Sequence, residues 1–179
     1  MASGKRALKG ILLFFFLAIL FLSVAYLFTI PDTKWLRNKN PDLTSLMKYR
    51  LRNAPEGYKI KKKWVPLSEI SPYLIKAVLI AEDDRFYTHE GFDIEGIKEA
   101  LKKDIKKGRF VAGGSTISQQ LAKNLFLTPE KTIARKLREA IITWRLEKTL
   151  SKRRILELYL NVVEWGPGIF GAEAAARYY

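Results

Sequence analysis

The sequence predicts a mainly α-helical protein with a single N-terminal transmembrane helix, and three observations lead to that prediction. A run of twenty residues, Ile11 to Ile30, contains no charged side chain. From Ser71 onward, apolar residues recur every three or four positions, as on one face of a helix. No segment alternates apolar and polar residues for more than a few positions, as a half-buried strand would. At 179 residues the chain is long enough for one sizeable core.

The N-terminal run is long enough to cross a bilayer, because twenty helical residues span about 30 Å. Lys5, Arg6 and Lys9 precede it, which predicts a cytoplasmic N-terminus over residues 1–10 and a body on the far side of the membrane. A cleavable signal peptide is the alternative. The run is longer than the usual ~7–15 apolar residues of such a peptide, and no small-x-small cleavage site follows it. We therefore expect an uncleaved transmembrane helix over residues 11–30.

The chain is strongly basic, with 32 Lys and Arg against 18 Asp and Glu and a formal charge of +14. Residues 31–179 alone carry +11, which suits contact with anionic headgroups or lipid phosphates; general solubility is the plainer explanation. Because the body is expected outside the cytoplasm, we predict no nucleic-acid partner. The absence of cysteine excludes a disulfide framework, and a single histidine, His89, argues against a zinc site of the usual kind.

The segment after the membrane run, residues 31–63, is mixed and basic. Trp35 and Tyr49 lie there among several Lys and Arg residues, a composition typical of a juxtamembrane segment near headgroups. The stretch from Tyr58 to Trp64 fits either an extended strand or a basic linker.

Four helices are expected in the remainder. Ser71 and Pro72 suit the N-cap and first position of one that continues to Glu82. A second is expected from Asp93 to Lys107, a third is opened by Thr128-Pro129, and a fourth is opened by Ser151. The apolar positions predicted to face inward are Leu74, Ile75, Val78 and Leu79 in the first helix; Ile94, Ile97, Leu101 and Ile105 in the second; Ile133, Leu137, Ile141 and Trp144 in the third; and Ile155, Leu158, Tyr159 and Val162 in the fourth.

The stretch from Ala81 to Asp93 contains the first group of candidate catalytic residues. Three consecutive acids, Glu82, Asp83 and Asp84, directly follow the apolar run Ala77 to Ala81. An apolar segment that packs in the core and is directly followed by acids is expected to place a carboxylate at the edge of a cleft. Burial there would raise the pKa of the nearest acid and suit it to general acid or base chemistry. The alternative is an ordinary surface charge cluster at a helix end.

A second patch, Gly113 to Gln120, places two glycines and then hydroxyls before a helical pattern. Such a turn presents backbone N–H groups at a helix N-terminus, where anions such as phosphate bind, and Lys123 lies one turn beyond Gln119. The same residues also make a plain capped turn. A nucleotide P-loop is excluded, because it would place Lys immediately before the hydroxyl residue.

Two further patches lie on predicted helices. Arg135 and Glu139 are spaced i, i+4, which indicates either a surface ion pair worth about 0.3–0.5 kcal/mol or a carboxylate held ionised among bases that bind a diphosphate. Glu157 and Asn161 have the same spacing and are expected to brace a neighbouring loop.

These four patches, in this order, resemble those of the peptidoglycan glycosyltransferases of family 51, the lysozyme-like polymerases found in class A penicillin-binding proteins. The chain is most similar to the monofunctional biosynthetic form. The matching positions are Glu82, Asp83, Phe86, His89 and Gly91 for E-D-x-x-F-x-x-H-x-G; Gly113 to Gln120 for G-G-S-T-I-x-Q-Q; Arg135, Lys136 and Glu139 for R-K-x-x-E; and Ile155 to Asn161 for I-L-E-x-Y-L-N. The resemblance runs from about Trp64 to Tyr179 and implies a lysozyme-like glycosyltransferase domain over residues 64–179.

The resemblance implies a polymerase that joins a lipid-linked glycan to the 4-hydroxyl of lipid II, with inversion and release of undecaprenyl diphosphate. By this similarity Glu82 is the general base and Glu139 the second catalytic carboxylate. The substrate-binding positions are Asp83, Ser115, Thr116, Gln120, Lys123, Arg135 and Lys136. Asp83 and His89 are also expected to brace the site. Mg²⁺ or Mn²⁺ is a plausible cofactor, although the sequence shows no dedicated metal site.

The same resemblance implies a bacterial cytoplasmic (inner) membrane protein with a periplasmic or extracellular catalytic domain, and cell-wall synthesis and division proteins as possible partners. The chain stops within a helical pattern, residues 172–179, where family members usually continue for several helices, so a C-terminally truncated domain is expected. Two alternatives stay open. One is a non-catalytic lipid II-binding or scaffold remnant. The other is a lysozyme-like glycan hydrolase, against which the second and third patches argue.

Overall fold

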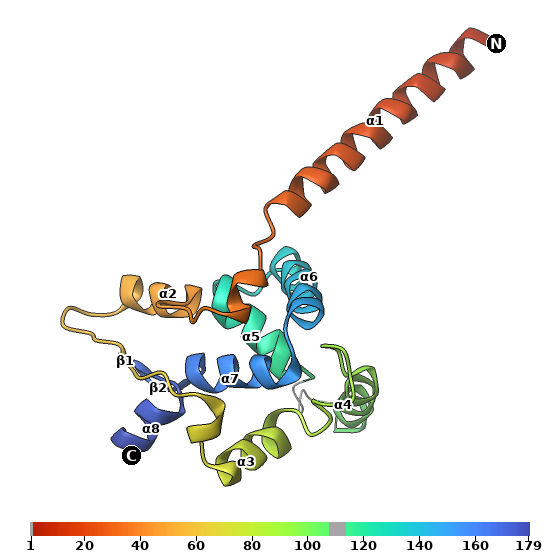
Figure 1. Ribbon diagram of the computed structural model, residues 1–179. Helices are drawn as coiled ribbons and strands as arrows, with labels where there is room; N and C mark the ends of the chain where they lie inside the picture. Colours follow the sequence, from red (N-terminus) through yellow and green to blue (C-terminus); the bar gives the residue numbers. More distant parts are fainter. Residues whose placement is uncertain (1, 108–113) are drawn as a thin grey trace. The chain divides into compact units, whose positions relative to one another are not determined.

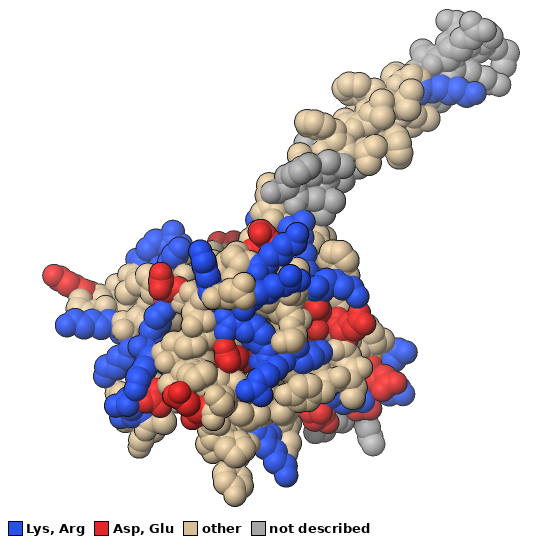
Figure 2. Space-filling model, in the orientation of Figure 1, with Lys and Arg blue, Asp and Glu red and all other residues tan. Residues whose placement is uncertain are grey.

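The computed structural model describes residues 2–107 and 114–179, so Gly113 of the second patch lies outside the described residues. The chain divides into two compact units, Met1–Asp32 and Thr33–Tyr179. Most of the predicted juxtamembrane segment lies within the second unit. Lys and Arg side chains spread over much of the visible face, with Asp and Glu among them (Figure 2).

The first unit is one helix, α1 (Ala2–Phe28), which contains most of the uncharged run. Its apolar residues from Ile11 to Leu17 are all exposed. In the part of the chain that the structure describes, no helix combines the length and the hydropathy needed to cross a membrane. The helix is present, and its role as a membrane span stays a prediction.

The second unit confirms the mainly helical class. Its elements are η1 (Lys34–Arg37), α2 (Ser45–Asn53), β1 (Lys61–Lys62), η2 (Leu67–Glu69), α3 (Pro72–Glu82), α4 (Ile94–Lys107), α5 (Ile117–Phe126), α6 (Ile133–Thr149), α7 (Lys152–Val162), β2 (Glu164–Gly166), β3 (Ile169–Phe170) and α8 (Ala172–Tyr178). Figure 1 shows α5 among α2, α6 and α7, and it packs against all three. Ile117 and Leu121 of α5 are fully buried, and each such side chain contributes about 1.5–3 kcal/mol.

The strand-or-linker ambiguity at Tyr58 to Trp64 is resolved in favour of a short strand. Strand β1 pairs parallel with β3, and β2 pairs antiparallel with β3, in the order β1-β3-β2. This small sheet packs beside α8, and it fixes the turn between β2 and β3.

Two predicted helix starts are confirmed. Helix α3 begins at Pro72 with Ser71 as N-cap, and α7 begins after Ser151, whose hydroxyl accepts the backbone N–H of Arg154 at 3.2 Å. The predicted inward face of α7 is buried as expected. In α3, Val78 of the predicted inward face is buried, and Leu74, Ile75 and Leu79 are half-buried, because the helix lies at the surface.

The predicted start of the third helix is wrong. Helix α6 begins at Ile133 rather than at Thr128-Pro129, since Thr132 supplies the cap: its hydroxyl accepts the backbone N–H of Arg135 at 3.1 Å. That bond satisfies one of the free N–H groups of the first turn.

The predicted inward face of α6 is also wrong. Ile133, Leu137 and Trp144 are 83%, 61% and 54% exposed, and Ile141 is half-buried. The buried face carries Glu139, Ile142, Thr143 and Leu146 instead, because that side of the helix faces α5 and α7. Apolar residues occur on both sides of α6, so periodicity alone did not select the correct one.

Helix α4 starts one residue later than predicted, at Ile94, and its described apolar stripe is not buried. Ile94, Ile97 and Ile105 are exposed, while the Leu101 side chain lies outside the described part of the chain. Helix α4 carries the predicted apolar stripe, but no described element packs extensively on that stripe.

Candidate active site

Glu82 is the last residue of α3, and its carboxylate is exposed at the end of that helix. The buried, partly apolar setting that the sequence predicted for it is therefore wrong, because α3 ends at the surface. Its Oε2 accepts a hydrogen bond from the Gln120 amide nitrogen at 2.8 Å. The Tyr159 hydroxyl donates to the Gln120 Oε1 at 3.2 Å. Three helices, α3, α5 and α7, thus hold one carboxylate in place.

Tyr159 remains a proton donor in this chain of contacts. Burial, followed by the negative charges of Glu82 and Asp83, raises the pKa of its phenol well above the ordinary value. The neutral hydroxyl therefore persists at physiological pH and orients the Gln120 amide with its nitrogen toward Glu82.

Asp83 and His89 brace the loop between α3 and α4. Asp83 is buried, and its Oδ2 accepts the backbone N–H of Ile117, the first residue of α5, at 2.9 Å. Its Oδ1 lies 2.9 Å from His89 Nε2, while the backbone N–H of Gly91 donates to His89 Nδ1 at 3.1 Å. Since Nδ1 accepts, Nε2 carries the proton and donates it to Asp83. The predicted bracing by these two residues is confirmed.

Thr116 is buried in a capping box at the start of α5. Its hydroxyl donates to the Gly91 carbonyl at 2.7 Å and accepts the Gln119 backbone N–H at 3.2 Å. Gly91 has φ +89°, and a Cβ there would lie 2.9 Å from side-chain carbons of Thr143 and Glu147, so only glycine fits. The described part of the second patch is thus a capped turn, in which the Thr116 hydroxyl is engaged within the protein.

An acidic pocket of about 330 Å³ opens between the end of α3, α4 and residues 114–116. Its acidic lining side chains are Glu82, Asp83, Asp84, Asp93 and Glu99, and Ser115 lies exposed at its edge.

Arg85 neutralises part of this acidic pocket. Its Nε lies 2.9 Å from Asp93 Oδ2. Burial pushes the pKa of Asp93 upward, but the Gly96 backbone N–H and Arg85 outweigh it and hold that pKa below its ordinary value.

Glu139 is only 2% exposed, so the surface ion pair predicted as one alternative is wrong. Arg135 Nη1 donates to one carboxylate oxygen at 2.6 Å and Lys136 Nζ to the other at 2.5 Å. One buried anion therefore fixes two cations. The Lys136 side chain stays half exposed, and Arg135 Nε is buried without a hydrogen-bond partner among the described residues.

Gln120 lines a basic pocket of about 440 Å³. Its charged lining residues are Arg50, Lys123, Lys131, Arg135 and Glu164. Gln120 lines this pocket and contacts Glu82, which lines the acidic one. The Gln120–Glu82 hydrogen bond therefore links the lining of the basic pocket to the lining of the acidic one.

The structure brings some of the predicted site residues together and separates others. Gln120, Lys123 and Arg135 line the basic pocket. Lys136 does not line that pocket, but it binds Glu139, which also binds Arg135. Asp83, Ser115 and Thr116 line the acidic pocket instead.

Arg50, Lys131 and Glu164 belong to the basic pocket but were not predicted as site residues. Helical spacing assigned Tyr159 to packing alone, although its place in the fourth motif was a signal of function. Glu157 and Asn161 brace a loop as predicted, through the backbone of Leu67 and Val65.

The donor groups do not fit a resident Mg²⁺ or Mn²⁺. Among the described residues, no three acidic, histidine or cysteine side chains converge to hold a metal ion. Glu139, the natural ligand candidate, uses both oxygens on Arg135 and Lys136.

Comparison with known proteins gives the family. A family model described as Transglycosylase matches residues 49–179. A biosynthetic peptidoglycan transglycosylase of Azoarcus sp. (strain BH72) is 56% identical over 165 residues, which cover 90% of this chain and 71% of the relative. Proteins of the same name from Dechloromonas aromatica (strain RCB) and Aromatoleum aromaticum (strain DSM 19018 / LMG 30748 / EbN1) are 60% and 52% identical, over 78% and 98% of this chain and 62% and 77% of their own lengths. The chain therefore belongs to the transglycosylase family.

Proposed function

We propose that this chain is a peptidoglycan glycosyltransferase that joins a lipid-linked glycan to the 4-hydroxyl of lipid II, with inversion and release of undecaprenyl diphosphate. Family membership and the names of the relatives support the reaction class. The observation that carries the proposal is the hydrogen bond between Gln120 and Glu82, which ties a carboxylate to the rim of a basic pocket. A base beside a diphosphate site is what glycosyl transfer from a lipid diphosphate requires.

Glu82 acts as the general base in this proposal. It takes the proton of the acceptor 4-hydroxyl while that oxygen attacks the anomeric carbon of the donor. The bond from the anomeric carbon to the diphosphate oxygen breaks on the opposite face, which inverts the centre. Gln120 fixes the carboxylate in the direction of attack, and Tyr159 fixes Gln120.

The leaving diphosphate receives the bonding electrons and gains negative charge. Lys123, Lys131 and Arg135 of the basic pocket stabilise that charge, and preorganised cations do so without reorganisation cost. Glu139 acts as a positioning residue, because it holds Arg135 and Lys136 in fixed orientations.

The acidic pocket receives the acceptor in this proposal. Ser115 is exposed there and offers a hydroxyl to the sugar. Asp83 and Thr116 act indirectly, since their polar atoms are engaged within the protein.

We further propose that residues 1–10 are cytoplasmic, residues 11–30 span the bacterial inner membrane, and the second unit acts outside the cytoplasm. The uncharged run and the bases before it support this arrangement. Because the chain has no cysteine, single substitutions Ser3→Cys and Ser68→Cys each give one label site. An impermeant thiol reagent applied to intact spheroplasts should label Ser68→Cys alone; labelling of both or of Ser3→Cys alone would contradict the topology.

Polymerisation of labelled lipid II by the detergent-solubilised chain tests the function. Polymer from the parent and none from Glu82→Gln is expected. A parent that is folded by circular dichroism yet makes no polymer would refute the proposal and favour a non-catalytic role. Release of fragments from finished peptidoglycan without polymerisation would favour hydrolysis instead.

A further inference from the structure

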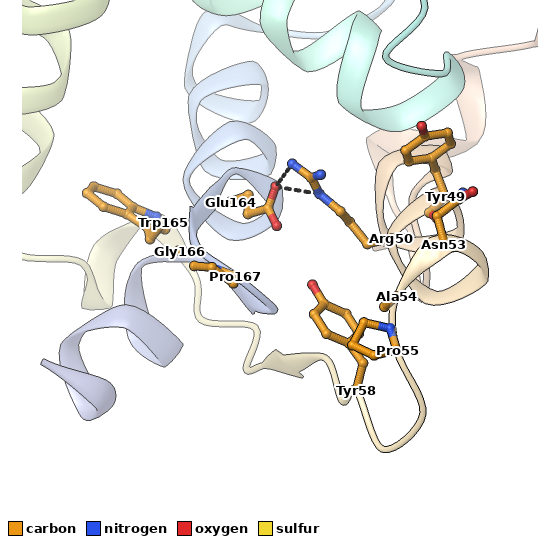
Figure 3. Close-up of a pocket in the computed structure, with 10 residues that line it drawn as sticks. All are labelled: Tyr49, Arg50, Asn53, Ala54, Pro55, Tyr58, Glu164, Trp165, Gly166 and Pro167. Atoms are coloured by element: carbon orange, nitrogen blue, oxygen red, sulfur yellow. Dashed lines mark hydrogen bonds and ion pairs between the residues drawn. The ribbon is translucent and has the colours of Figure 1, made fainter.

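A buried ion pair joins α6 to α7 next to the loop between α3 and α4. Ion pairs elsewhere in the chain often keep one partner in water, as Arg50 does beside Glu164 at the pocket in Figure 3, where its side chain is 45% exposed. By contrast, Glu147 near the end of α6 and Lys152 at the start of α7 are 7% and 22% exposed, and Lys152 Nζ lies 2.8 Å from Glu147 Oε1. None of the reaction steps above uses this pair, and the four motifs do not include it.

The pair also binds α5. Ser118, the second residue of α5, is fully buried and donates its hydroxyl to the same Glu147 oxygen at 2.5 Å. Ser118 occupies the unspecified position of G-G-S-T-I-x-Q-Q, so the motif alone indicated no contact there. Ser118, Glu147 and Lys152 therefore connect three helices, and α5 also carries Gln120, the hydrogen-bond partner of Glu82.

The loop between α3 and α4 contacts the pair at two places. Lys152 Nζ lies 4.5 Å from the centroid of the Phe86 ring, within the ~6 Å over which a cation and an aromatic face attract each other. The Phe86 ring is fully buried and meets the His89 ring edge-on, with the centroids 6.4 Å apart. A Cβ at Gly91 would lie 2.9 Å from Glu147 Cγ, so the loop backbone packs directly on the Glu147 side chain.

This part of the loop leads to Glu82 through short contacts. His89 Nε2 lies 2.9 Å from Asp83, which directly follows Glu82 in the chain. Asp83 also accepts the backbone N–H of Ile117 at the start of α5. A displacement of Phe86 or His89 would therefore reach Asp83, and from there both Glu82 and the helix that carries its hydrogen-bond partner.

A charged pair in this place adds little stability over apolar side chains. Removing two charges from water costs free energy, and replacing a buried ion pair by apolar residues of similar volume is often neutral or stabilising. What the charges add is direction, because Glu147 accepts from Ser118 and Lys152 at one oxygen while Lys152 also faces the Phe86 ring. These contacts specify one arrangement of the three helices and the loop.

We propose that Glu147 and Lys152 are positioning residues for the transfer reaction, which hold the loop after Glu82 and thereby aim the Glu82 carboxylate at the acceptor hydroxyl. The inference rests on the proposed function. Neither residue contacts substrate in this proposal. Lys152 fixes Phe86, Glu147 fixes the loop backbone, and Asp83 transmits the constraint to Glu82.

The main test is the double substitution Glu147→Met with Lys152→Met in the full chain. It removes both charges together and keeps both unbranched side chains, so the melting temperature should change little. A single Lys152→Met would instead leave a buried carboxylate without its cation. In polymerisation of lipid II, kcat of the double variant should fall about tenfold, because small misplacements of a catalytic group lower rates by up to ~100-fold. KM should change little, since the basic pocket is untouched.

Two further variants serve as controls. Lys152→Arg keeps the cation and should retain most of kcat. Lys148→Met removes the neighbouring lysine of α6, whose ion pair with Glu90 joins the same loop at 2.9 Å but is exposed on both sides. Because exposed pairs contribute little, Lys148→Met should behave like the parent.

His89 provides a second readout that a change in stability alone would not move. It is the only histidine of the chain, so nitrogen NMR of the imidazole reports one side chain. The parent should show the tautomer with the proton on Nε2, since Nδ1 accepts the Gly91 N–H. The double variant should lose part of that preference, and Lys148→Met should keep it.

These measurements separate the inference from the proposed function. If the parent polymerises lipid II and the folded double variant keeps its kcat and its His89 tautomer, the positioning role is wrong and the function stands. If the parent makes no polymer, the function is wrong, and the NMR comparison alone decides whether the pair holds the loop. Should the double variant not fold, Ser118→Ala decides: kcat is expected to fall about twofold to fivefold, as for one lost hydrogen bond, and a parent-like kcat and tautomer would overturn the inference.

Discussion

At the scale of single residues, the candidate base owes its position to two neutral side chains rather than to burial. Glu82 is exposed, but the Gln120 amide and the Tyr159 hydroxyl form a chain of hydrogen bonds that ends on its carboxylate. An exposed carboxylate has many orientations, and each fixed contact removes some of them. Orientation, not a dry environment, is what the protein supplies here before substrate binds.

Tyr159→Phe removes the donor to Gln120 while the aromatic ring still fills its buried space. We expect kcat to fall about threefold to tenfold, because a neutral hydrogen bond contributes about 1 kcal/mol. Melting temperature should change little. Steady-state polymerisation of lipid II measures the effect, and Tyr73→Phe at an exposed position is the control. An unchanged kcat in Tyr159→Phe would show that Gln120 is oriented by other contacts.

Asp93→Asn should make stability depend on pH less steeply at the acid end. The pKa of Asp93 is lowered in the folded chain, so its contribution is fully present above the ordinary aspartate pKa. The contribution is lost as pH falls through the lower, folded-state value. Urea denaturation should therefore find the variant less stable at neutral pH, and the two proteins should converge in strong acid. A constant difference at every pH would argue against this linkage.

At the scale of elements, sequence could predict which segments are helical better than which side of each is buried. Ser71-Pro72 and Ser151 are local signals of a helix start, so α3 and α7 begin where predicted. The buried sides of α4 and α6 depend on neighbours that lie far away in sequence, and both predictions were wrong there. The exposure of Glu82 depends in the same way on where α3 ends.

The same distinction between local and long-range signals decides which residues of the candidate site could be predicted from the sequence. The motif order pointed to Glu82, Gln120 and Glu139, of which Gln120 contacts Glu82 and Glu139 binds Arg135 of the basic pocket. Arg50 and Lys131, by contrast, belong to basic stretches in which spacing distinguishes no residue from its neighbours. Only the packing of α2 on α5 shows that Arg50 lines a pocket.

Thr132→Ala tests the corrected start of α6. The Thr132 hydroxyl caps the helix, so its removal should lower the free energy of unfolding by about 0.5–2 kcal/mol. Thr128→Ala, at the start that the sequence predicted, is the matched control and should have less effect. Urea denaturation of both variants provides the measurement. Equal losses, or a larger loss at Thr128, would contradict the assignment of the cap.

At the scale of the whole molecule, charge is distributed unevenly around one hydrogen bond. The chain carries a formal +14, yet an acidic pocket and a basic pocket flank Gln120 and Glu82. In the proposed function, this local division sorts the two reactants: the diphosphate is directed to the basic pocket, and the hydroxyl acceptor meets the carboxylates of the acidic one.

Ionic strength should therefore act mainly on substrate capture. Raising it from about 0.05 M to about 0.5 M shortens the range of electrostatic attraction severalfold, so KM for lipid II should rise more than kcat falls. Lys131→Glu in the basic pocket should raise the KM for lipid II and make that KM depend less on salt. Lys59→Glu makes the same charge change outside that pocket and is the control. Equal responses in the two variants would show that overall charge, not the pocket, captures substrate.

The opposed pockets also define what an inhibitor of this site needs. A molecule that spans Gln120 meets fields of opposite sign at its two ends. One that carries an ammonium group toward Asp84 and Glu99 and a phosphonate toward Lys123 and Lys131 is electrostatically matched along its length. A purely anionic substrate mimic is matched only in its leaving-group half, and selectivity over other phosphate-binding proteins then depends on the cationic half.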